Sequence, residues 1–186
     1  ADPTFRSEDI YGHVRSVIEA IEPHDSVERF EGLGVKVIEA SGKFVGRQEV
    51  EAEGVRIVAR RIVVSTGSTA LVSPIPGLDK VPYLTNETVF ERHQLPKHLI
   101  IIGGGPMGVE LAQAHRHLGC EVTVLEMFSI MPKDDPELVD VVRQQLLRDG
   151  LDAREGVKII RIEPHADGVR VVLEKDDREY AVDGSH

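Results

Sequence analysis

The chain has 186 residues, with 22 basic and 32 acidic side chains, so its formal net charge is −10 at pH 7. A chain this acidic repels phosphate backbones and anionic lipid, which argues against binding to nucleic acid or to a membrane surface. Hydrophobic residues make up 41% of the sequence, enough for one full domain or two small ones to bury a core. Intrinsic disorder is therefore not expected.

Cysteine content and the N-terminus bear on the cellular compartment. The single cysteine, Cys120, excludes an intrachain disulfide, a paired redox dithiol and a cysteine-based zinc site. No apolar run approaches the ~20 residues needed to cross a bilayer, and residues 1–4 lack the basic and then apolar pattern of a signal peptide. We therefore expect a soluble, cytoplasmic protein. The missing initiator Met suggests that the chain was cut from a longer one or processed.

The first part of the chain predicts a helix followed by short strands. Apolar residues recur at helical spacing over residues 7–22, and Pro23 ends the pattern. Short β-rich runs broken by glycines then predict an antiparallel meander with strands at 35–38, 49–52 and 55–58. A continuous apolar strand is predicted at 62–65, directly before Thr66 and Gly67.

The second part predicts a strand–helix–strand unit. A buried strand at 99–102 precedes a glycine run, a helix over about 106–118 and a strand at 121–126. A second helix is bracketed by Asp135 and Gly150, and three strands follow near 157–163, 169–175 and 178–182. The residues of this second helix expected to face the core are Leu138, Val141, Val142 and Leu146.

Proline-rich residues 71–90, with little periodicity, are typical of a connector between packed units, so we predict units at 1–70 and 91–186. Both halves run through a helix, a short strand and a meander, and the sequence at 34–38 resembles that at 156–160. The first half continues into the strand at 62–65, whereas the second half stops where such a strand would begin. The simplest interpretation is a fragment of a duplicated two-domain protein that lacks its front and its last strand.

The strongest functional signal is the pattern Gly103-x-Gly105-x-x-Gly108 between a predicted strand and helix. Gly103 permits a tight turn, Gly105 lets a diphosphate approach the backbone, and Gly108 lets the helix pack closely on the strand. The diphosphate would lie at the helix N-terminus, where N–H groups and the dipole favour negative charge. The alternative is a glycine-rich turn that binds nothing.

Glu126 lies 23 positions after the first motif glycine, at the end of the second strand. A carboxylate there can accept both hydroxyls of an adenosine ribose but repels a 2′-phosphate, which favours NAD(H) over NADP(H). The following residues 127–131 contain no arginine to hold such a phosphate. The alternative is a solvated carboxylate at the end of a strand.

Other polar residues give weaker signals. Glu110 lies one turn into the helix, where it is either partly buried near a ligand or an ordinary solvated residue. His115 and His117 point about 200° apart on a helix, so they cannot share a metal. Cys120 is expected to be a small core residue. We assign no catalytic residue and no metal site.

The chain resembles the FAD-dependent pyridine nucleotide-disulfide oxidoreductases, which include dihydrolipoamide dehydrogenase, mercuric reductase and glutathione reductase. The resemblance covers nearly the whole chain and is closest to the dihydrolipoamide dehydrogenase and mercuric reductase-like branch. It rests on the segment Val64–Ser68, the proline-rich connector from Ile75-Pro76-Gly77 to Thr85-Asn86, and the stretch Ile100–Ala112.

The resemblance implies cofactor contacts at particular positions. Glu110 would lie by the nicotinamide and Val157 near the adenine. Pro106 stands where the family places a gating side chain that is often aromatic, so a tyrosine-type gate is not expected. The residues that would hold NAD are Gly103, Gly104, Gly105, Pro106, Met107, Gly108 and Glu126. The positions that match places where the family's backbone approaches FAD are Gly42, Thr66, Gly67 and Ser68.

The family's own FAD-binding glycines and redox cysteines would precede this chain, and its dimerisation domain, with a catalytic His-Glu pair, would follow it. We therefore expect an α/β fold: a Rossmann-like, three-layer NAD-binding domain with an antiparallel β-meander, preceded by part of a similar FAD-binding domain. The parent would move hydride between NADH and FAD and on to a disulfide-type acceptor, whereas this chain alone would be inactive.

Several alternatives remain open. The chain could be a non-catalytic NAD-binding module, or a piece of a flavin NADH oxidase. The acceptor could be lipoamide, mercuric ion or a small disulfide. The parent is expected to be a homodimer. The chain itself is expected to lose FAD and to self-associate, because an absent closing strand leaves apolar surface uncovered.

Overall fold

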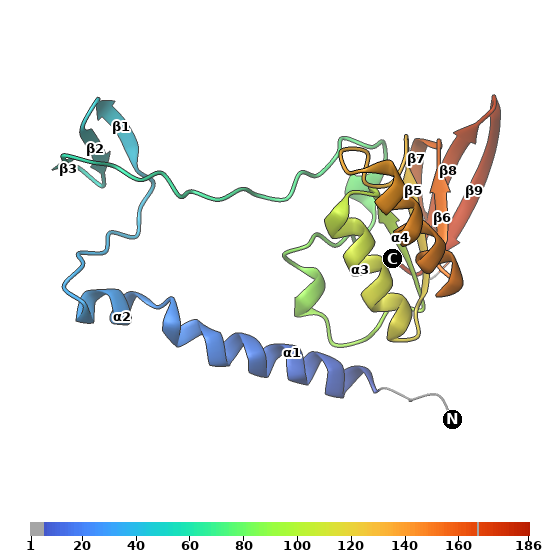
Figure 1. Ribbon diagram of the computed structural model, residues 1–186, viewed down its shortest axis with the longest axis horizontal. Helices are drawn as coiled ribbons and strands as arrows, with labels where there is room; N and C mark the ends of the chain where they lie inside the picture. The colour runs from blue at the N-terminus through green and yellow to red at the C-terminus, as the bar shows by residue number, and fades with distance from the viewer. Residues whose placement is uncertain (1–5, 167) are drawn as a thin grey trace. The chain divides into compact units, whose positions relative to one another are not determined.

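A computed structural model describes residues 6–166 and 168–186 (Figure 1). Residues 1–4, considered above for a leader sequence, lie outside the described residues. The chain divides into two compact units, one formed by His13–Thr69 and the other by residues 70–186 together with the chain up to Gly12. Within the described residues, no helix is long and apolar enough to cross a membrane.

The predicted first helix is confirmed as α1 (Ser7–Ile21). The apolar face of its second half is exposed, with Val17, Ile18 and Ile21 each more than 40% accessible. A 3₁₀ turn, η1 (Glu22–His24), and the short α2 (Val27–Gly32) follow, and Ser26 Oγ caps α2 by accepting from the N–H of Arg29 at 3.3 Å.

The smaller unit contains an antiparallel sheet in the order β1-β2-β3, made of β1 (Lys43–Gly46), β2 (Glu49–Ala52) and β3 (Val55–Val58). The second and third predicted strands are confirmed, whereas the strand predicted at 35–38 is wrong, since these residues form no regular structure. The first strand lies at β1 instead, because a short turn pairs Gly46 with Glu49 and sets a local hairpin register.

The strand predicted at 62–65 is also wrong. The apolar run is present, but within the described part of the chain no strand pairs with it. Val63 is 87% exposed and Val64 is 64% exposed. A parallel strand forms only where a neighbouring strand satisfies its backbone, and sequence pattern alone does not supply that neighbour.

The larger unit begins with the connector, which includes η2 (Leu78–Lys80) and η3 (Val89–Glu91). A parallel sheet in the order β4-β5-β6 follows, and the expected strand–helix–strand unit is confirmed at its start. Sequence analysis did not locate β6, a short strand of four mostly charged residues. The elements are β4 (His98–Ile102), α3 (Pro106–His117), β5 (Glu121–Glu126), α4 (Pro136–Arg148) and β6 (Asp152–Glu155).

An antiparallel meander completes the unit and confirms the last three predicted strands: β7 (Lys158–His165), β8 (Gly168–Lys175) and β9 (Arg178–Gly184). Two buried clusters lie on opposite faces of the parallel sheet, because alternate side chains of a strand point to opposite faces. The helix-side cluster includes Leu99, Val122, Val124, Val139 and Leu146. The meander-side cluster includes Leu125, Val157, Val171 and Leu173. These layers confirm the predicted three-layer α/β fold (Figure 1).

The expected inward face of α4 is partly wrong. Leu146 is buried at 1% exposure, as predicted, and Val139 is buried with it. Leu138 is 67% exposed and Val141 is 66% exposed, while Val142 lies at the margin. Val139 and Leu146 are seven residues apart and share one helix face, whereas Leu138 is rotated from that face by about 100°.

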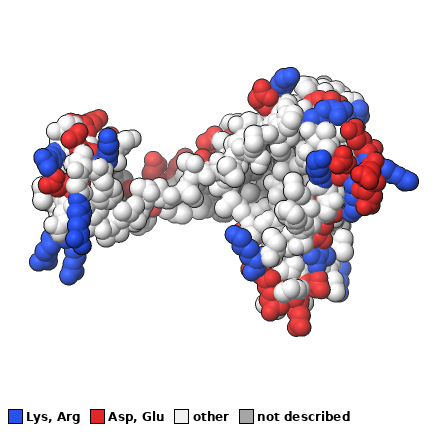
Figure 2. All heavy atoms as spheres, turned by 90° about the horizontal axis from the view of Figure 1, so that it is seen from above, with Lys and Arg blue, Asp and Glu red and all other residues white. Residues whose placement is uncertain are grey.

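The last two residues lie along the edge of β4 opposite β5. The N–H of Ser185 donates to His98 O at 2.9 Å, and the N–H of Ile100 donates to His186 O at 2.9 Å. Figure 2 shows acidic and basic side chains interspersed along the margin of the larger unit, around a broad uncharged area. On this face of the larger unit, basic side chains alternate with acidic ones and form no continuous basic patch.

Candidate functional site

The glycine loop joins β4 to α3 and is shaped by two glycines. Gly103 has φ of +107°, a conformation that L side chains rarely adopt. A Cβ atom added to Gly108 would lie 2.2 Å from the carbonyl oxygen of Gly103, closer than any real contact. Glycine at both positions therefore allows the first turn of α3 to pack directly against the turn that follows the strand.

The two middle glycines face different surroundings. A Cβ on Gly104 would lie 2.8 Å from Ile130 Cγ2 and 3.1 Å from Glu126 Cβ, so this residue is packed against its own protein. A Cβ on Gly105 would meet nothing within 4 Å. Open space beside the backbone of Gly105 is what a glycine loop needs if a ligand is to approach it closely.

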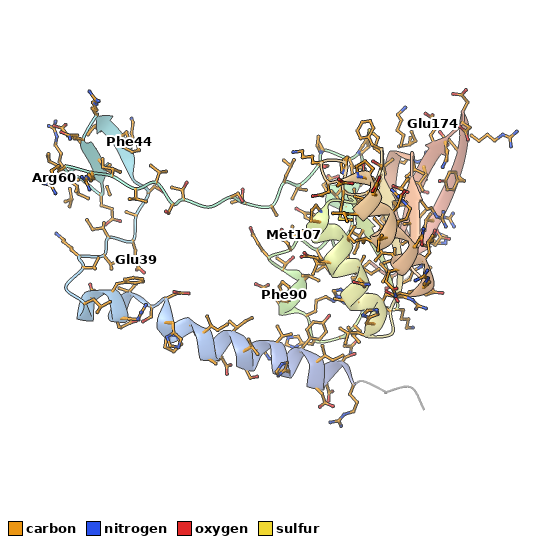
Figure 3. The ribbon with its side chains drawn as sticks, in the orientation of Figure 1. Glu39, Phe44, Arg60, Phe90, Met107 and Glu174 are labelled. Atoms are coloured by element: carbon orange, nitrogen blue, oxygen red, sulfur yellow. The ribbon has the colours of Figure 1, made fainter. Side chains whose placement is uncertain are left out.

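The N-terminus of α3 is available to an anion. Gly105 is the N-cap residue and supplies no side-chain cap, Pro106 occupies the first turn, and no acidic residue lies in that turn. The first N–H groups of a helix have no partner within the helix, and the helix dipole favours negative charge beside them. Met107 follows at the start of α3, where Figure 3 labels it, and is 54% exposed.

Glu126 is fixed beside the loop by two backbone hydrogen bonds. The N–H of Gly104 donates to Glu126 Oε2 at 2.7 Å, and the N–H of Phe128 donates to Oε1 at 2.9 Å. The carboxylate is half-buried, so it differs from the freely solvated carboxylate considered as an alternative. Each oxygen retains a lone pair for a further donor, such as a hydroxyl.

Val157 and Phe128 lie next to Glu126. The N–H of Val157 donates to Glu126 O at 3.1 Å, and the N–H of Gly156 donates to Phe128 O at 3.0 Å. The Val157 side chain is buried at 2% exposure in the meander-side cluster that includes Leu125 of β5. Phe128 is 72% exposed, and sequence reasoning did not single it out. Its position two residues after Glu126 was the available signal.

The salt bridge between Arg143 and Glu155, next to the segment that contacts the glycine loop, was not predicted from the sequence. Arg143 Nε donates to Glu155 Oε2 at 2.9 Å, and Glu155 Oε1 accepts from the N–H of Ile130 at 2.7 Å. The N–H of Met131 in turn donates to Gly104 O at 2.8 Å. The hydrogen bond from Arg143 lowers the pKa of Glu155, with a smaller contribution from the N–H of Ile130. The pair therefore anchors the segment that supports the glycine loop.

Glu155→Gln is expected to lower the free energy of unfolding by about 1–3 kcal/mol, because it weakens a charge-assisted bond and disturbs the bond to Ile130. Since folding lowers the pKa of Glu155, the stabilisation is present above the ordinary carboxyl pKa and is lost as pH falls through the lowered one. Urea unfolding at a series of pH values measures this difference. Glu179→Gln, at a side chain 60% exposed, is the matched control. Equal effects of the two changes would contradict the assigned role.

The other residues considered from the sequence take no part in the hydrogen bonds described for the glycine loop. Glu110 is exposed, in agreement with the solvated alternative. Cys120 is buried at 2% exposure, as expected of a core residue. His115 Nδ1 lies 2.8 Å from Leu111 O, and His117 Nε2 lies 3.2 Å from Asp149. Among the described residues, no three side chains form a group suited to a metal ion.

The positions matched to FAD contacts, Gly42 and Thr66–Ser68, lie in the smaller unit. Gly42 and Thr66–Ser68 are exposed. Figure 3 labels Phe44 and Arg60 in this unit, and both line its hollow of about 320 Å³. None of the matched positions lines that hollow. The residues that line it are Phe44, Arg47, Gln48, Ala59, Arg60, Arg61, Ile62 and Val64.

Comparison with known proteins assigns the chain to a family. Residues 7–185 match the family model described as pyridine nucleotide-disulphide oxidoreductase. Because the match covers nearly the whole chain, the chain belongs to that family. The family resemblance inferred from sequence is thereby confirmed, and so at a coarse level is its association with pyridine nucleotide.

Individual relatives agree with this assignment. The chain is 32% identical to a mercuric reductase of Bacillus cereus over 84% of this chain and 25% of the relative. It is 34% identical to a dihydrolipoyl dehydrogenase of Thermus scotoductus over 77% of this chain and 31% of the relative. The chain thus spans about a quarter to a third of these curated relatives.

A solved structure also matches both units. It is a Cu(II) complex of a HOCl-induced flavoprotein disulfide reductase from Escherichia coli, at 25% identity and a TM-score of 0.81. The match covers 99% of this chain and 42% of that one. A second structure, from Mycobacterium tuberculosis, has 24% identity and a TM-score of 0.79 over 99% of this chain and 42% of that one, and it shows the same fold.

Proposed function

We propose that the larger unit binds NAD(H) through the glycine loop and Glu126. The observation that carries this proposal is the combination of open space at Gly105 with a carboxylate fixed 2.7 Å from the N–H of Gly104. A diphosphate would lie against Gly105 and the uncapped start of α3, with Pro106 and Met107 beside it. The domain proposed here is the part of the chain from about residue 91 onward.

Glu126 would distinguish NAD(H) from NADP(H). Its two oxygens can each accept one further hydrogen bond, as the two ribose hydroxyls require, whereas a 2′-phosphate would meet a fixed negative charge. Phe128 offers an exposed ring and Val157 a backbone edge on the adenosine side. Glu110, one turn into α3, would lie on the nicotinamide side. The family's chemistry depends on hydride that NADH supplies when it is bound, and these residues bind and orient the nucleotide.

The proposed activity of the whole protein is hydride transfer between NADH and a flavin, with electrons passing to a disulfide-type acceptor. Support comes from relatives named mercuric reductase and dihydrolipoyl dehydrogenase. We assign no catalytic residue within the described chain and propose that it does not turn over such an acceptor alone. As in the family, the whole protein would be a dimer and would bind FAD mainly through residues outside this chain.

Glu126→Gln tests the nucleotide preference. We expect NADH binding to weaken by about tenfold or more, since a hydrogen bond to a charged group contributes about 1.5–3 kcal/mol. NADPH binding should weaken less or improve, because the change removes the charge that repels its phosphate. Calorimetric titration with both nucleotides measures the ratio of their affinities.

Glu121→Gln is the matched control, because it makes the same change at an exposed residue at the other end of β5. It should leave both affinities unchanged. Tighter binding of NADPH than NADH by the unaltered chain would contradict the proposed preference. So would equal effects of the two substitutions.

A further inference from the structure

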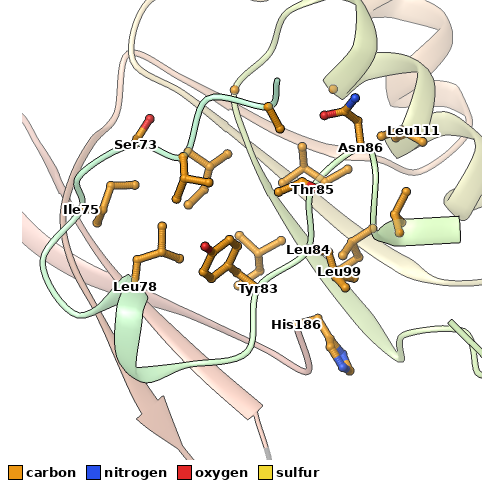
Figure 4. Close-up of a pocket in the computed structure, with 18 of the residues that line it drawn as sticks. Ser73, Ile75, Leu78, Tyr83, Leu84, Thr85, Asn86, Leu99, Leu111 and His186 are labelled. Carbon is orange, nitrogen blue, oxygen red and sulfur yellow. The ribbon is translucent and has the colours of Figure 1, made fainter. Parts of the chain in front are cut away.

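The glycine loop borders an apolar groove of about 470 Å³, which Figure 4 shows in close-up. Gly103, Gly105 and Gly108 line this groove, and most of the other lining side chains are hydrocarbon. None of the described residues that line it is Asp, Glu, Lys or Arg. Gly104 does not line the groove and bonds Glu126 instead. The charges that can distinguish a ribose hydroxyl from a 2′-phosphate therefore lie beside Glu126, outside the groove.

Glu155 adjoins Glu126 on the neighbouring strand. The two residues are register partners in the parallel pairing of β5 with β6. Neighbouring strands lie about 4.8 Å apart, and paired residues share a face of the sheet. That face is the helix side, because Val124 and Ala153, each two residues earlier in its strand, both belong to or pack against the helix-side cluster. Two carboxylates thus lie next to each other at the end of the strands.

Arg143 of α4 holds the second of these carboxylates. Its Nε donates to Glu155 Oε2 at 2.9 Å and its Nη2 donates to Oε1 at 3.0 Å, which is the strong two-point geometry of an arginine–carboxylate pair. Arg143 also pairs with Asp140, one turn earlier in α4, whose side chain is 66% exposed. Because an exposed ion pair contributes little, Glu155 is the main partner that fixes the guanidinium.

Arg143 is a group that the local sequence after Glu126 does not provide. Residues 127–131 contain no arginine that could hold a 2′-phosphate. The fold supplies one from α4, and its bond with Glu155 places it one strand away from Glu126. A guanidinium binds phosphate through paired N–H donors. The surroundings of Glu126 therefore contain both a carboxylate suited to ribose hydroxyls and an arginine suited to a 2′-phosphate.

We propose that Glu155 is a positioning residue for nucleotide specificity, which holds Arg143 away from the adenosine ribose and so maintains the preference for NAD(H). This inference rests on the proposed function. While Glu155 is ionised, both of its oxygens engage the guanidinium, and a 2′-phosphate would meet the charge of Glu126 without a cation to offset it. Once that charge is removed, Arg143 keeps only its exposed partner, and its long side chain can turn toward the phosphate.

Glu155→Gln tests the proposal with little other change. Its amide oxygen can still accept from the N–H of Ile130, and Lys175 Nζ bonds the backbone oxygen of Glu155 rather than the carboxylate. We expect the affinity for NADPH relative to NADH to rise by about tenfold, because a hydrogen bond between charged groups contributes at least that factor. Calorimetric titration measures both affinities on the same preparation, so any unfolded fraction affects them equally and cancels in the ratio.

A second substitution shows whether the gain depends on Arg143. Glu155→Gln combined with Arg143→Met should lose the gain, because no cation remains to bind the phosphate. Glu137→Gln makes the same change at an exposed residue of α4 and is the matched control, which should leave the ratio within about twofold of its original value. Adenosine 2′,5′-bisphosphate compared with AMP should repeat these changes, since the pair differs only at the 2′ position.

The outcomes separate this inference from the function on which it rests. If the unaltered chain binds NADH but Glu155→Gln leaves the ratio unchanged, the inference is wrong and the proposed function stands. Equal weakening of both nucleotides would also overturn it, because Glu155 would then act only by supporting the loop. So would a gain that persists without Arg143. Failure of the unaltered chain to bind NADH would overturn the proposed function and this inference together.

Discussion

Gly105→Ala is expected to weaken NADH binding by at least about tenfold, which corresponds to ~1.4 kcal/mol, while leaving the free energy of unfolding within about 1 kcal/mol. The reason is that the added Cβ enters the open space that the diphosphate needs but meets no protein atom within 4 Å. Gly105 has φ of −68° and ψ of 171°, which alanine adopts without strain. Calorimetric titration and urea unfolding measure the two effects separately.

Gly108→Ala is the contrasting variant on the same loop. Its Cβ would lie 2.2 Å from Gly103 O, so the backbone must shift, and we expect a loss of about 1–3 kcal/mol in stability together with a loss of binding. The pair separates a ligand contact from a packing requirement. Unchanged NADH binding by Gly105→Ala would contradict the proposed position of the diphosphate.

Leu146→Ala is expected to lower the free energy of unfolding by about 2–5 kcal/mol, because it opens a cavity between α4 and the parallel sheet. Leu146 is 1% exposed and belongs to the helix-side cluster. Leu138→Ala makes the same change on the same helix at a side chain 67% exposed, and should cost less than about 0.5 kcal/mol. Urea unfolding compares them. A larger loss in Leu138→Ala would mean that Leu138 rather than Leu146 faces the core, and would contradict the packing of α4.

The sequence predicted the elements whose signals are local. The strand–helix–strand unit follows from an apolar run, a glycine pattern and a helix start with Pro106. The last meander, β7 to β9, follows from the alternation of apolar and polar residues between predicted turns. The prediction of a strand at 62–65 was wrong because a parallel strand depends on a neighbouring strand that is distant in sequence. The predicted inward face of α4 was partly wrong because six apolar residues are spread around the helix, so the sequence alone does not decide which of them face the sheet.

The candidate site was only partly predictable. The spacing of the glycines and Glu126 is a sequence property, so these residues could be named in advance. The bond from Gly104 to Glu126 and the support from Glu155 through Ile130 depend on how two loops pack. Glu155 lies at the end of a short, mostly charged strand that sequence analysis did not locate. Contacts between loops therefore required the structure.

Backbone amide chemical shifts recorded during titration with NADH report directly on whether the glycine loop holds the nucleotide. We expect saturable shifts that are largest at Gly104, Gly105, Met107 and Gly108, with further shifts at Phe128 beside Glu126. NADPH should produce the same pattern only at higher concentration. An absence of shifts in this loop, or saturable shifts confined to the smaller unit, would contradict the assignment of the glycine loop as the nucleotide site.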